Sequence, residues 1–476
     1  RFHSAGTIAL KRPEDYESAL RSAHVIASFE ERQTKIRELV ERSASALNAR
    51  AVIDQTLLDE VTGLVEWPVA LAGSFEERFL EVPSQALILS MKEHQKYFHV
   101  VDASGSLLPY FITVSNIEST DPSQVIQGNE RVIRPRLSDA AFFFETDKKI
   151  TLESRARNLG SIVFQHKLGS LHDKTLRVSR LAGELAGKIG APVGPAERAG
   201  LLCKADLLSD MVQEFSDMQG IAGYYYALHD GETEDVAMAL EQQYWPRFSG
   251  DKLPEGNTAC VLALADRLDT LCGIFGIGQP PTGSKDPFAL RRASLAVLRI
   301  IVGKDLALDL RECLALAQSQ YPEGVIDPQC TERVLEYMIE RFRAWYEDEN
   351  IPPEVFKAVA AKALSKPLDI QQRVHAVNAF TQLPEAGALS AAHKRVSNIL
   401  AKLEEGYSFS GVSANLLVEP EEIALANCLL TVRTASTAHY EHGAYTEALA
   451  CLATIKAPID EFFDGVMVNA EDPALR

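Results

Sequence analysis

Residues 266–302, DRLDTLCGIFGIGQPPTGSKDPFALRRASLAVLRIIV, constrain the fold most, because a Gly/Pro loop separates two helical patterns there. Asp286 is placed to accept backbone N–H bonds as an N-cap, and Pro287 suits the first helical position, where no N–H is needed. Arg292 and Arg299 lie seven residues apart, so they share a helix face distinct from the apolar one. The predicted buried face consists of Leu290, Ala293, Val297 and Ile300. The stretch therefore predicts a loop that fixes a helix and presents arginines.

Strand patterns are confined to the first part of the chain. A strand is predicted at 65–71, limited to a sheet edge or a bulge by Pro68, and a β-hairpin is predicted from 96–101 and 109–114. Apolar residues at helical spacing dominate after about residue 150. Two unbroken helical stripes are predicted, one from Leu201, Ala205, Leu208, Val212 and Phe215, the other from Val261, Leu264, Leu268 and Leu271.

These patterns predict a mainly α, multi-domain protein with an N-terminal α+β part. The Pro/Gly break at 384–387 is a candidate boundary. We therefore predict a mixed part at 1–150, a helical domain at 151–385 and a second helical domain at 386–476.

Composition narrows the functional classes. The net charge of −18 argues against a general nucleic-acid binder, although clustered basic groups would still allow RNA contact. Seven scattered cysteines without a C-x-x-C pair favour reduced thiols, and no run of about 18 apolar residues suggests a membrane span. We expect a cytoplasmic protein without a membrane partner.

A phosphate-binding loop is the first chemical candidate. Residues 278–285, GQPPTGSK, nearly match G-x-x-x-x-G-K-[ST], but the last two residues are transposed. Two prolines remove N–H donors, and the preceding segment has a helical rather than a strand pattern. A structural turn is the better interpretation.

A metal-dependent phosphohydrolase of the HD type is the second candidate, since helices of that class supply His, His-Asp and Asp ligands. The His-Asp dipeptides are His172-Asp173 and His229-Asp230. Where the helical core should carry His-Asp, the chain has Cys203-Lys204, followed by Asp206, with Asp266 further on. A lysine brings positive charge to a place where a cation needs neutral imidazole and carboxylate. A helical domain that has lost its metal is therefore favoured over a working site.

Nucleic-acid contact is the third candidate. Arg131, Arg134 and Arg136 precede the aromatic cluster 142–144, and Lys394-Arg395 forms a second basic pair. Arginines near aromatic rings suit phosphates and stacked bases. For each cluster the alternative is a solvated helix face above a core that contains the phenylalanines.

Six segments, spread in order along the chain, resemble the β subunit of the bacterial heterotetrameric glycyl-tRNA synthetase. They are MKEHQKYF (91–98), GNERVIRPRLSDAAFFFETD (128–147), FQHKLGSLHDKTLRV (164–178), DLLSDMVQEFSDMQGIAG (206–223), GIGQPPTGSKDPFALRRASLAVLRI (276–300) and HKRVSNILAK (393–402). The resemblance implies a piece trimmed at both ends relative to the family.

The resemblance also implies a division of labour. A separate α subunit would use ATP and Mg²⁺ to activate glycine within an α2β2 complex, while this chain recognises tRNA(Gly) and carries no cofactor and no catalytic residue. The middle domain would be a degenerate HD domain without metal, keeping Lys204, Asp206 and Asp266, and 386–476 an anticodon-binding domain. The candidate RNA contacts are Arg131, Arg134, Arg136, Arg291, Arg292, Lys394 and Arg395. The alternatives are an active HD-type phosphohydrolase and a purely structural assembly subunit.

Overall fold

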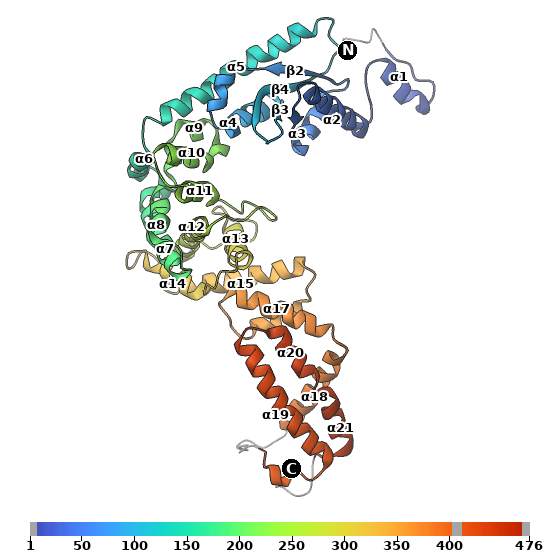
Figure 1. The fold of residues 1–476 in the computed structure, drawn as a ribbon, viewed down its shortest axis with the longest axis vertical. Coiled ribbons are helices and arrows are strands. Elements are labelled where there is room, and N and C mark those ends of the chain that lie inside the picture. Colours follow the sequence, from blue (N-terminus) through green and yellow to red (C-terminus); the bar gives the residue numbers. More distant parts are fainter. Residues whose placement is uncertain (1–6, 402–411, 469–476) are drawn as a thin grey trace. The chain divides into compact units, whose positions relative to one another are not determined.

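The computed structural model describes residues 7–401 and 412–468, and its contacts divide the chain into two compact units (Figure 1). Unit 1 comprises Arg1–Ser179 and Gly194–Tyr244, and unit 2 comprises Arg180–Val193 and Trp245–Arg476. The fold is mainly α with an N-terminal α+β part, as predicted. Among the described residues, no helix is both long and apolar enough to cross a bilayer.

Unit 1 holds all of the strands in the described part of the chain. Its elements are α1 (Tyr16–Ser22), α2 (Phe29–Ala46), β1 (Arg50–Ala51), α3 (Gln55–Leu64), β2 (Val69–Ser74), α4 (Ser84–Leu89), β3 (Phe98–Val101), β4 (Leu107–Ser115), α5 (Pro122–Asp147), α6 (Leu152–Asn158), β5 (Val163–Gln165), β6 (Gly169–Ser170), α8 (Val193–Leu202), α9 (Asp210–Glu214), α10 (Ile221–His229) and α11 (Glu234–Gln242). Helix α7 (Leu171–Lys188) begins in unit 1 and ends in unit 2.

The main sheet is antiparallel, with strand order β1-β3-β4-β2. The predicted hairpin is confirmed as β3 and β4, and the Asp102 carboxylate closes its turn by accepting the N–H groups of Ser104 at 2.8 Å and Ser106 at 2.9 Å. The strand predicted at 65–71 was placed too early. It begins at Val69, directly after Pro68, because a proline has no N–H to give to the pairing with β4.

Two helices bury one face of this sheet. Ile36 and Val40 of α2 and Leu58 of α3 pack with Phe98 and Ile112 in a core cluster that excludes solvent. Helix α5 runs along the edge strand β2 (Figure 1).

The prediction of one unbroken helix over 201–215 is wrong. Helix α8 ends at Leu202, a 3₁₀ turn follows at Ala205–Leu208, and α9 begins at Asp210. The Ser209 hydroxyl accepts the N–H of Val212 at 3.2 Å, so this serine caps a new helix instead of continuing the old one. The sequence still shows a continuous helical spacing of apolar residues here, because Ala205 in the 3₁₀ turn and Val212 in α9 are both buried.

A buried ion pair ties the end of α5 to three later elements of unit 1. Asp147 is 1 % exposed, and its carboxylate accepts from Arg155 of α6 at 2.8 Å. The same carboxylate accepts the N–H groups of Asp210 and Met211 at 3.0 Å and the hydroxyl of Tyr226 at 2.8 Å. The interactions therefore join α5, α6, α9 and α10 at one point.

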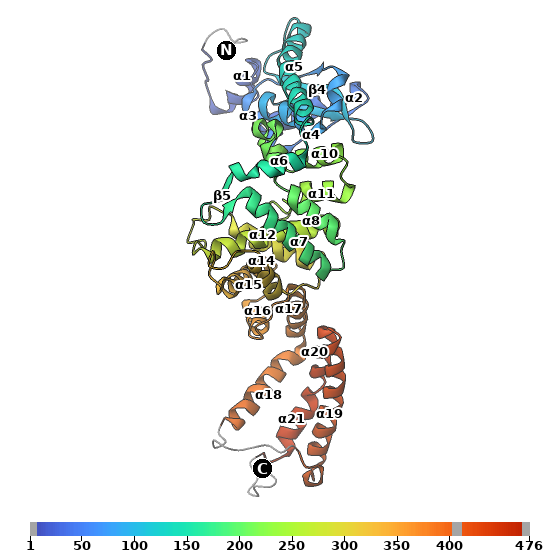
Figure 2. The same ribbon diagram turned by 90° about the vertical axis from the view of Figure 1, so that its left-hand side faces the viewer.

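Unit 2 is helical throughout its described part. Its elements are α12 (Asn257–Gly276), α13 (Leu290–Gly303), α14 (Leu310–Ser319), α15 (Cys330–Asp348), α16 (Pro353–Ala360), α17 (Pro367–Thr381), α18 (Pro384–Leu400), α19 (Pro420–Glu441), α20 (Tyr445–Ala453) and α21 (Lys456–Gly465). The stripe predicted at Val261, Leu264, Leu268 and Leu271 is confirmed, since all four side chains are buried in α12. Helix α19 packs against α20 and α21 (Figure 2).

Candidate nucleic-acid interface

The three arginines predicted on α5 are all exposed. Arg134 forms an ion pair with Glu76 at 2.9 Å, whereas Arg131 and Arg136 have no partner in the described part of the chain. Phe142 lies about three helical turns beyond Arg131 on the same side of the helix, and it is 64 % exposed. Phe144, by contrast, is buried. Arg131 and the exposed Phe142 ring therefore share one side of α5, whereas Arg136 lies about 140° around the helix from Arg131.

Helix α13 begins at Leu290, so the predicted start at Pro287 is wrong. Residues 286–289 form a turn in which Ala289 adopts a left-handed conformation, with φ of 53°. Asp286 still caps the helix, because its carboxylate accepts the N–H groups of Leu290 at 2.8 Å and Arg291 at 3.0 Å. The cap thus holds Arg291 and Arg292 at the first turn of the helix.

These arginines line a pocket of about 560 Å³ in unit 2, which we call the arginine pocket. Its walls come from the loop after Trp245, from α13 and from α15. The lining residues are Pro246, Arg247, Phe248, Ser249, Gly250, Arg291, Arg292, Leu295, Ala296, Arg299, Arg341, Ala344, Trp345 and Asp348. Five arginines therefore face a single carboxylate, in a chain whose net charge is −18.

Two of the five arginines are committed to the protein backbone. Arg299 donates to the carbonyl oxygens of Phe248 at 3.0 Å and Asp251 at 2.7 Å, and so it fixes the loop that forms one wall. Arg291 donates to the carbonyl oxygen of Gly283. The predicted shared face of Arg292 and Arg299 is confirmed, because both side chains line this pocket.

The arginine and aromatic members of the pocket that were not predicted from the sequence are Arg247, Phe248, Arg341 and Trp345. The sequence does hold a local pattern for each of these two pairs. Arg247 and Phe248 sit side by side in a Gly/Pro-containing loop, and Arg341 and Trp345 are four residues apart, hence on one helix face. The packing of α15 beside α13 and the hydrogen bonds from Arg299 to the loop bring the two pairs to the same cavity.

The last predicted basic pair lies on α18. Lys394 and Arg395 are both exposed, but the Arg395 guanidinium stacks over the Phe463 ring of α21 at 3.8 Å. Arg395 thus takes part in packing one helix on another, and Lys394 is the more available of the two for an RNA phosphate.

Lys204 and Asp206, two of the three residues predicted as remnants of a metal site, are buried and hydrogen-bonded. The Lys204 ammonium donates to Gln243 at 2.8 Å and to the Tyr244 hydroxyl at 3.3 Å. Asp206 accepts the Gly220 N–H at 2.6 Å, and burial raises the pKa of its carboxyl to about 6. Asp266 belongs to α12 in unit 2. Within residues 7–401 and 412–468, no three His, Cys, Asp or Glu side chains are grouped closely enough to hold a metal ion.

The aspartates of both His-Asp dipeptides accept backbone N–H groups. Asp173 accepts the N–H of Ser170 at 2.8 Å, and Asp230 accepts the N–H of Leu152 at 2.7 Å. Asp230 leads into a turn at Gly231, where φ is +85°. The near-match to a phosphate loop at 278–285 follows helix α12 and contains a turn between Thr282 and Lys285. It lacks the preceding strand that such a loop requires.

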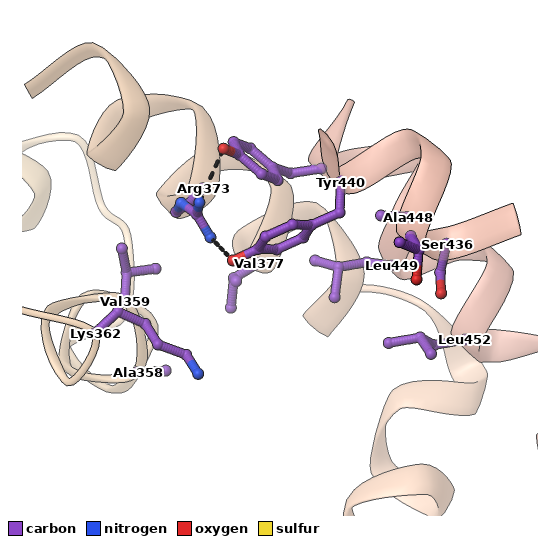
Figure 3. A pocket seen from close by; sticks show the side chains of 12 residues that line it. Ala358, Val359, Lys362, Arg373, Val377, Ser436, Tyr440, Ala448, Leu449 and Leu452 are labelled. Atoms are coloured by element: carbon purple, nitrogen blue, oxygen red, sulfur yellow. Dashed lines mark hydrogen bonds between the residues drawn. The ribbon is translucent and has the colours of Figure 1, made fainter. Parts of the chain in front are cut away.

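A second polar cluster joins α17 to the helices that follow it (Figure 3). The Arg373 guanidinium lies 4.7 Å from the ring centre of Tyr440 and 4.2 Å from that of Tyr445, and it donates to both hydroxyls. Asp369 pairs with Arg373 at 3.0 Å and accepts from Tyr445. The cluster borders an apolar pocket of about 490 Å³ between these helices.

Comparison with known proteins agrees with this arrangement. Residues 389–476, which include most of α18 and all of α19, α20 and α21, match the family described as "DALR anticodon binding domain". Residues 1–361 match "Glycyl-tRNA synthetase beta subunit". The chain belongs to the glycyl-tRNA synthetase beta subunit family.

Curated relatives are similar over their shared length. "Glycine--tRNA ligase beta subunit" of Hahella chejuensis is 53 % identical over 478 residues, the same-named protein of Chromohalobacter salexigens 53 % over 481, and that of Salmonella arizonae 52 % over 477. In each comparison 100 % of this chain aligns with 69 % of the relative.

Proposed function

We propose that this chain serves as the tRNA-recognising β subunit of a glycine–tRNA ligase. The observation that carries the proposal is the alignment of the entire chain, at about half identity, with proteins named glycine–tRNA ligase beta subunit. The anticodon-binding match at 389–476 and the unpaired arginines of α5 and the arginine pocket give the chain surfaces that suit RNA.

The chain's contribution is to hold tRNA(Gly) rather than to perform the chemistry. A partner α subunit would bind ATP and Mg²⁺ and form the glycyl adenylate, in a cytoplasmic α2β2 complex. This chain would place the 3′-terminal ribose of the tRNA at that adenylate. Positioning two reactants converts a bimolecular step into an effectively unimolecular one, which can supply a large part of the rate enhancement without a nucleophile or acid–base pair here.

Glycylation by the purified α subunit, with and without this chain, tests the proposal. Charging of tRNA(Gly) should require the chain. Arg292→Ala, at an exposed arginine without a protein partner, should raise the KM for tRNA and leave ATP–pyrophosphate exchange intact. If exchange fell in parallel with charging, Arg292 would be serving assembly or folding. If α charged tRNA equally well alone, the proposed function would be wrong.

Two other functions make different predictions. A phosphohydrolase would release phosphate from nucleotides in the presence of Mn²⁺, although Lys204 occupies the place where a ligand would be needed. A structural assembly subunit would support the α subunit without any affinity of its own for tRNA.

A further inference from the structure

The arginine pocket combines positive charge with exposed aromatic surface, and the chain's own fold uses only part of it. Arg247 and Arg292 are exposed and make no ion pair or side-chain hydrogen bond in the described part of the chain. The Nε of Arg341 is shielded from solvent and has no hydrogen-bond acceptor. Within the described residues these three guanidinium groups make no hydrogen bond, although that of Arg341 lies over the Tyr337 ring at 5.2 Å. The other two arginines donate to backbone carbonyls, Arg299 in the pocket loop and Arg291 at Gly283.

These free donors suit phosphate. A guanidinium offers five N–H groups in a planar fork and stays charged at all relevant pH values, so it matches phosphate oxygens in pairs. Positive charge gathered in a concave, low-dielectric site attracts anions more strongly than the same charge spread on a convex surface. Asp348 is the one carboxylate in the lining.

The aromatic residues indicate what accompanies the phosphate. Phe248 is 64 % exposed, and two hydrogen bonds from Arg299 anchor the backbone of the loop that carries it. Trp345 is braced against Phe342, at 5.2 Å between ring centres, and its indole N–H donates to Glu349 at 2.7 Å, so its orientation is fixed. The exposed Phe248 ring and the half-buried Trp345 ring thus lie beside arginines, an arrangement on which unpaired bases stack.

The size of the pocket limits its occupant. A volume of about 560 Å³ lies within the range of sites that enclose one small molecule. Double-stranded RNA is instead read from its surface, across successive minor grooves. The pocket therefore fits one nucleotide whose base is free to leave its helix.

We propose that the arginine pocket binds a single unpaired nucleotide of tRNA, with Arg247, Arg292 and Arg341 on its phosphates and its base against Phe248 and Trp345. This inference rests on the proposed function. It adds that an unpaired nucleotide, and not a base-paired stem, is the tRNA element held by unit 2 at this place.

Filter binding of tRNA(Gly) to the full chain tests the assignment. Base stacking contributes about 1–3 kcal/mol, so Phe248→Ala should raise the Kd about 5- to 150-fold. Arg292→Ala should also raise the Kd and reduce the slope of log K against log salt by about 0.7, the value for one phosphate of a single strand. The matched controls are Leu64→Ala, which removes a side chain that is 62 % exposed, and Arg42→Ala, at an exposed arginine of α2.

Chemical probing of the bound tRNA separates the possible sources of the nucleotide. Loss of protection at one unpaired base in Phe248→Ala, with stem protection unchanged, would support the proposal. An unchanged Kd for Phe248→Ala, or an equal loss in Leu64→Ala, would overturn it. The proposal would also be overturned if Phe248→Ala weakened the binding of AMP but left the affinity for tRNA unchanged, because the pocket would then be a site for free nucleotides. Unchanged thermal midpoints verify folding. If the parent complex charges tRNA normally and Phe248→Ala does not change the Kd for tRNA, the nucleotide assignment is refuted while the proposed function stands.

Discussion

Breaking the buried Asp147–Arg155 pair should destabilise unit 1 more than any surface change. The two side chains are 1 % and 8 % exposed, and their atoms approach to 2.8 Å. Arg155→Met removes that bond together with two further donations, to the Leu208 carbonyl at 2.8 Å and to the Asp147 carbonyl at 3.0 Å. It also leaves the Asp147 charge buried without its cation.

The expected cost follows from that uncompensated charge. Removing one partner of a buried ion pair typically costs about 3–5 kcal/mol, because the desolvated charge left behind has lost its Coulombic attraction. The Asp147 carboxylate keeps the N–H groups of Asp210 and Met211 and the hydroxyl of Tyr226, which places the expected loss near the lower end, about 3 kcal/mol. Adding Asp147→Asn to Arg155→Met neutralises the stranded carboxylate, but the new amide NH2 must face the N–H of Asp210 or of Met211, so the double variant should recover little of the loss.

Urea unfolding at neutral pH measures this effect, with each transition followed separately because a chain of two units need not unfold in one step. The matched control is Arg157→Met in the same helix, since Arg157 is 75 % exposed and pairs with Glu153 at the surface. The control should leave the unfolding midpoint unchanged. A loss below about 1 kcal/mol for Arg155→Met would refute this reasoning.

Three other substitutions probe local interactions. Burial raises the pKa of Asp206 to about 6, above its unfolded value near 4, so the stability that its protonated form contributes is complete below about pH 4 and is lost as the pH rises to about 6. Asp206→Asn should therefore remove this fall from the pH dependence of the thermal midpoint. A variant with the same pH profile as the parent would contradict the prediction. Arg373→Met removes the ring contacts and hydrogen bonds that join α17 to α19 and α20, so limited proteolysis of this region should be faster. An unchanged cleavage rate would show that Arg373 does not hold these helices together. Asp286→Ala deletes a cap that accepts two N–H groups, and it should lower the free energy of unfolding by about 0.5–2 kcal/mol; no change in urea midpoint would show that the cap is dispensable.

Sequence patterns gave reliable information where the signal was local. Arg292 and Arg299 were expected on one face because seven residues make nearly two helical turns, and both line the same pocket. The β-hairpin was likewise predictable from two apolar runs around a short polar turn. The capping role of Asp286 was predicted correctly, but the three residues between Asp286 and the helix form a turn that the presence of an aspartate does not by itself indicate.

The errors arose where distant residues decide the structure. The apolar period over 201–215 could not show that Ser209 caps a new helix, since 3₁₀ and α turns bury similar positions. Arg341 and Trp345 join the pocket only through the packing of α15 beside α13, a contact between segments about 50 residues apart. The domain divisions at 150 and 385 and the individual RNA contacts remain predictions.

The affinity of the chain alone for tRNA(Gly), measured as a function of salt, tests the central claim most directly. If the chain recognises tRNA, binding should be measurable without the α subunit and should weaken linearly in log K against log salt, with Arg292→Ala reducing the slope. An equal affinity for tRNA(Gly) and for an unrelated tRNA would reduce the role to nonspecific attraction. No binding at low salt would contradict the account and assign the chain a purely structural role.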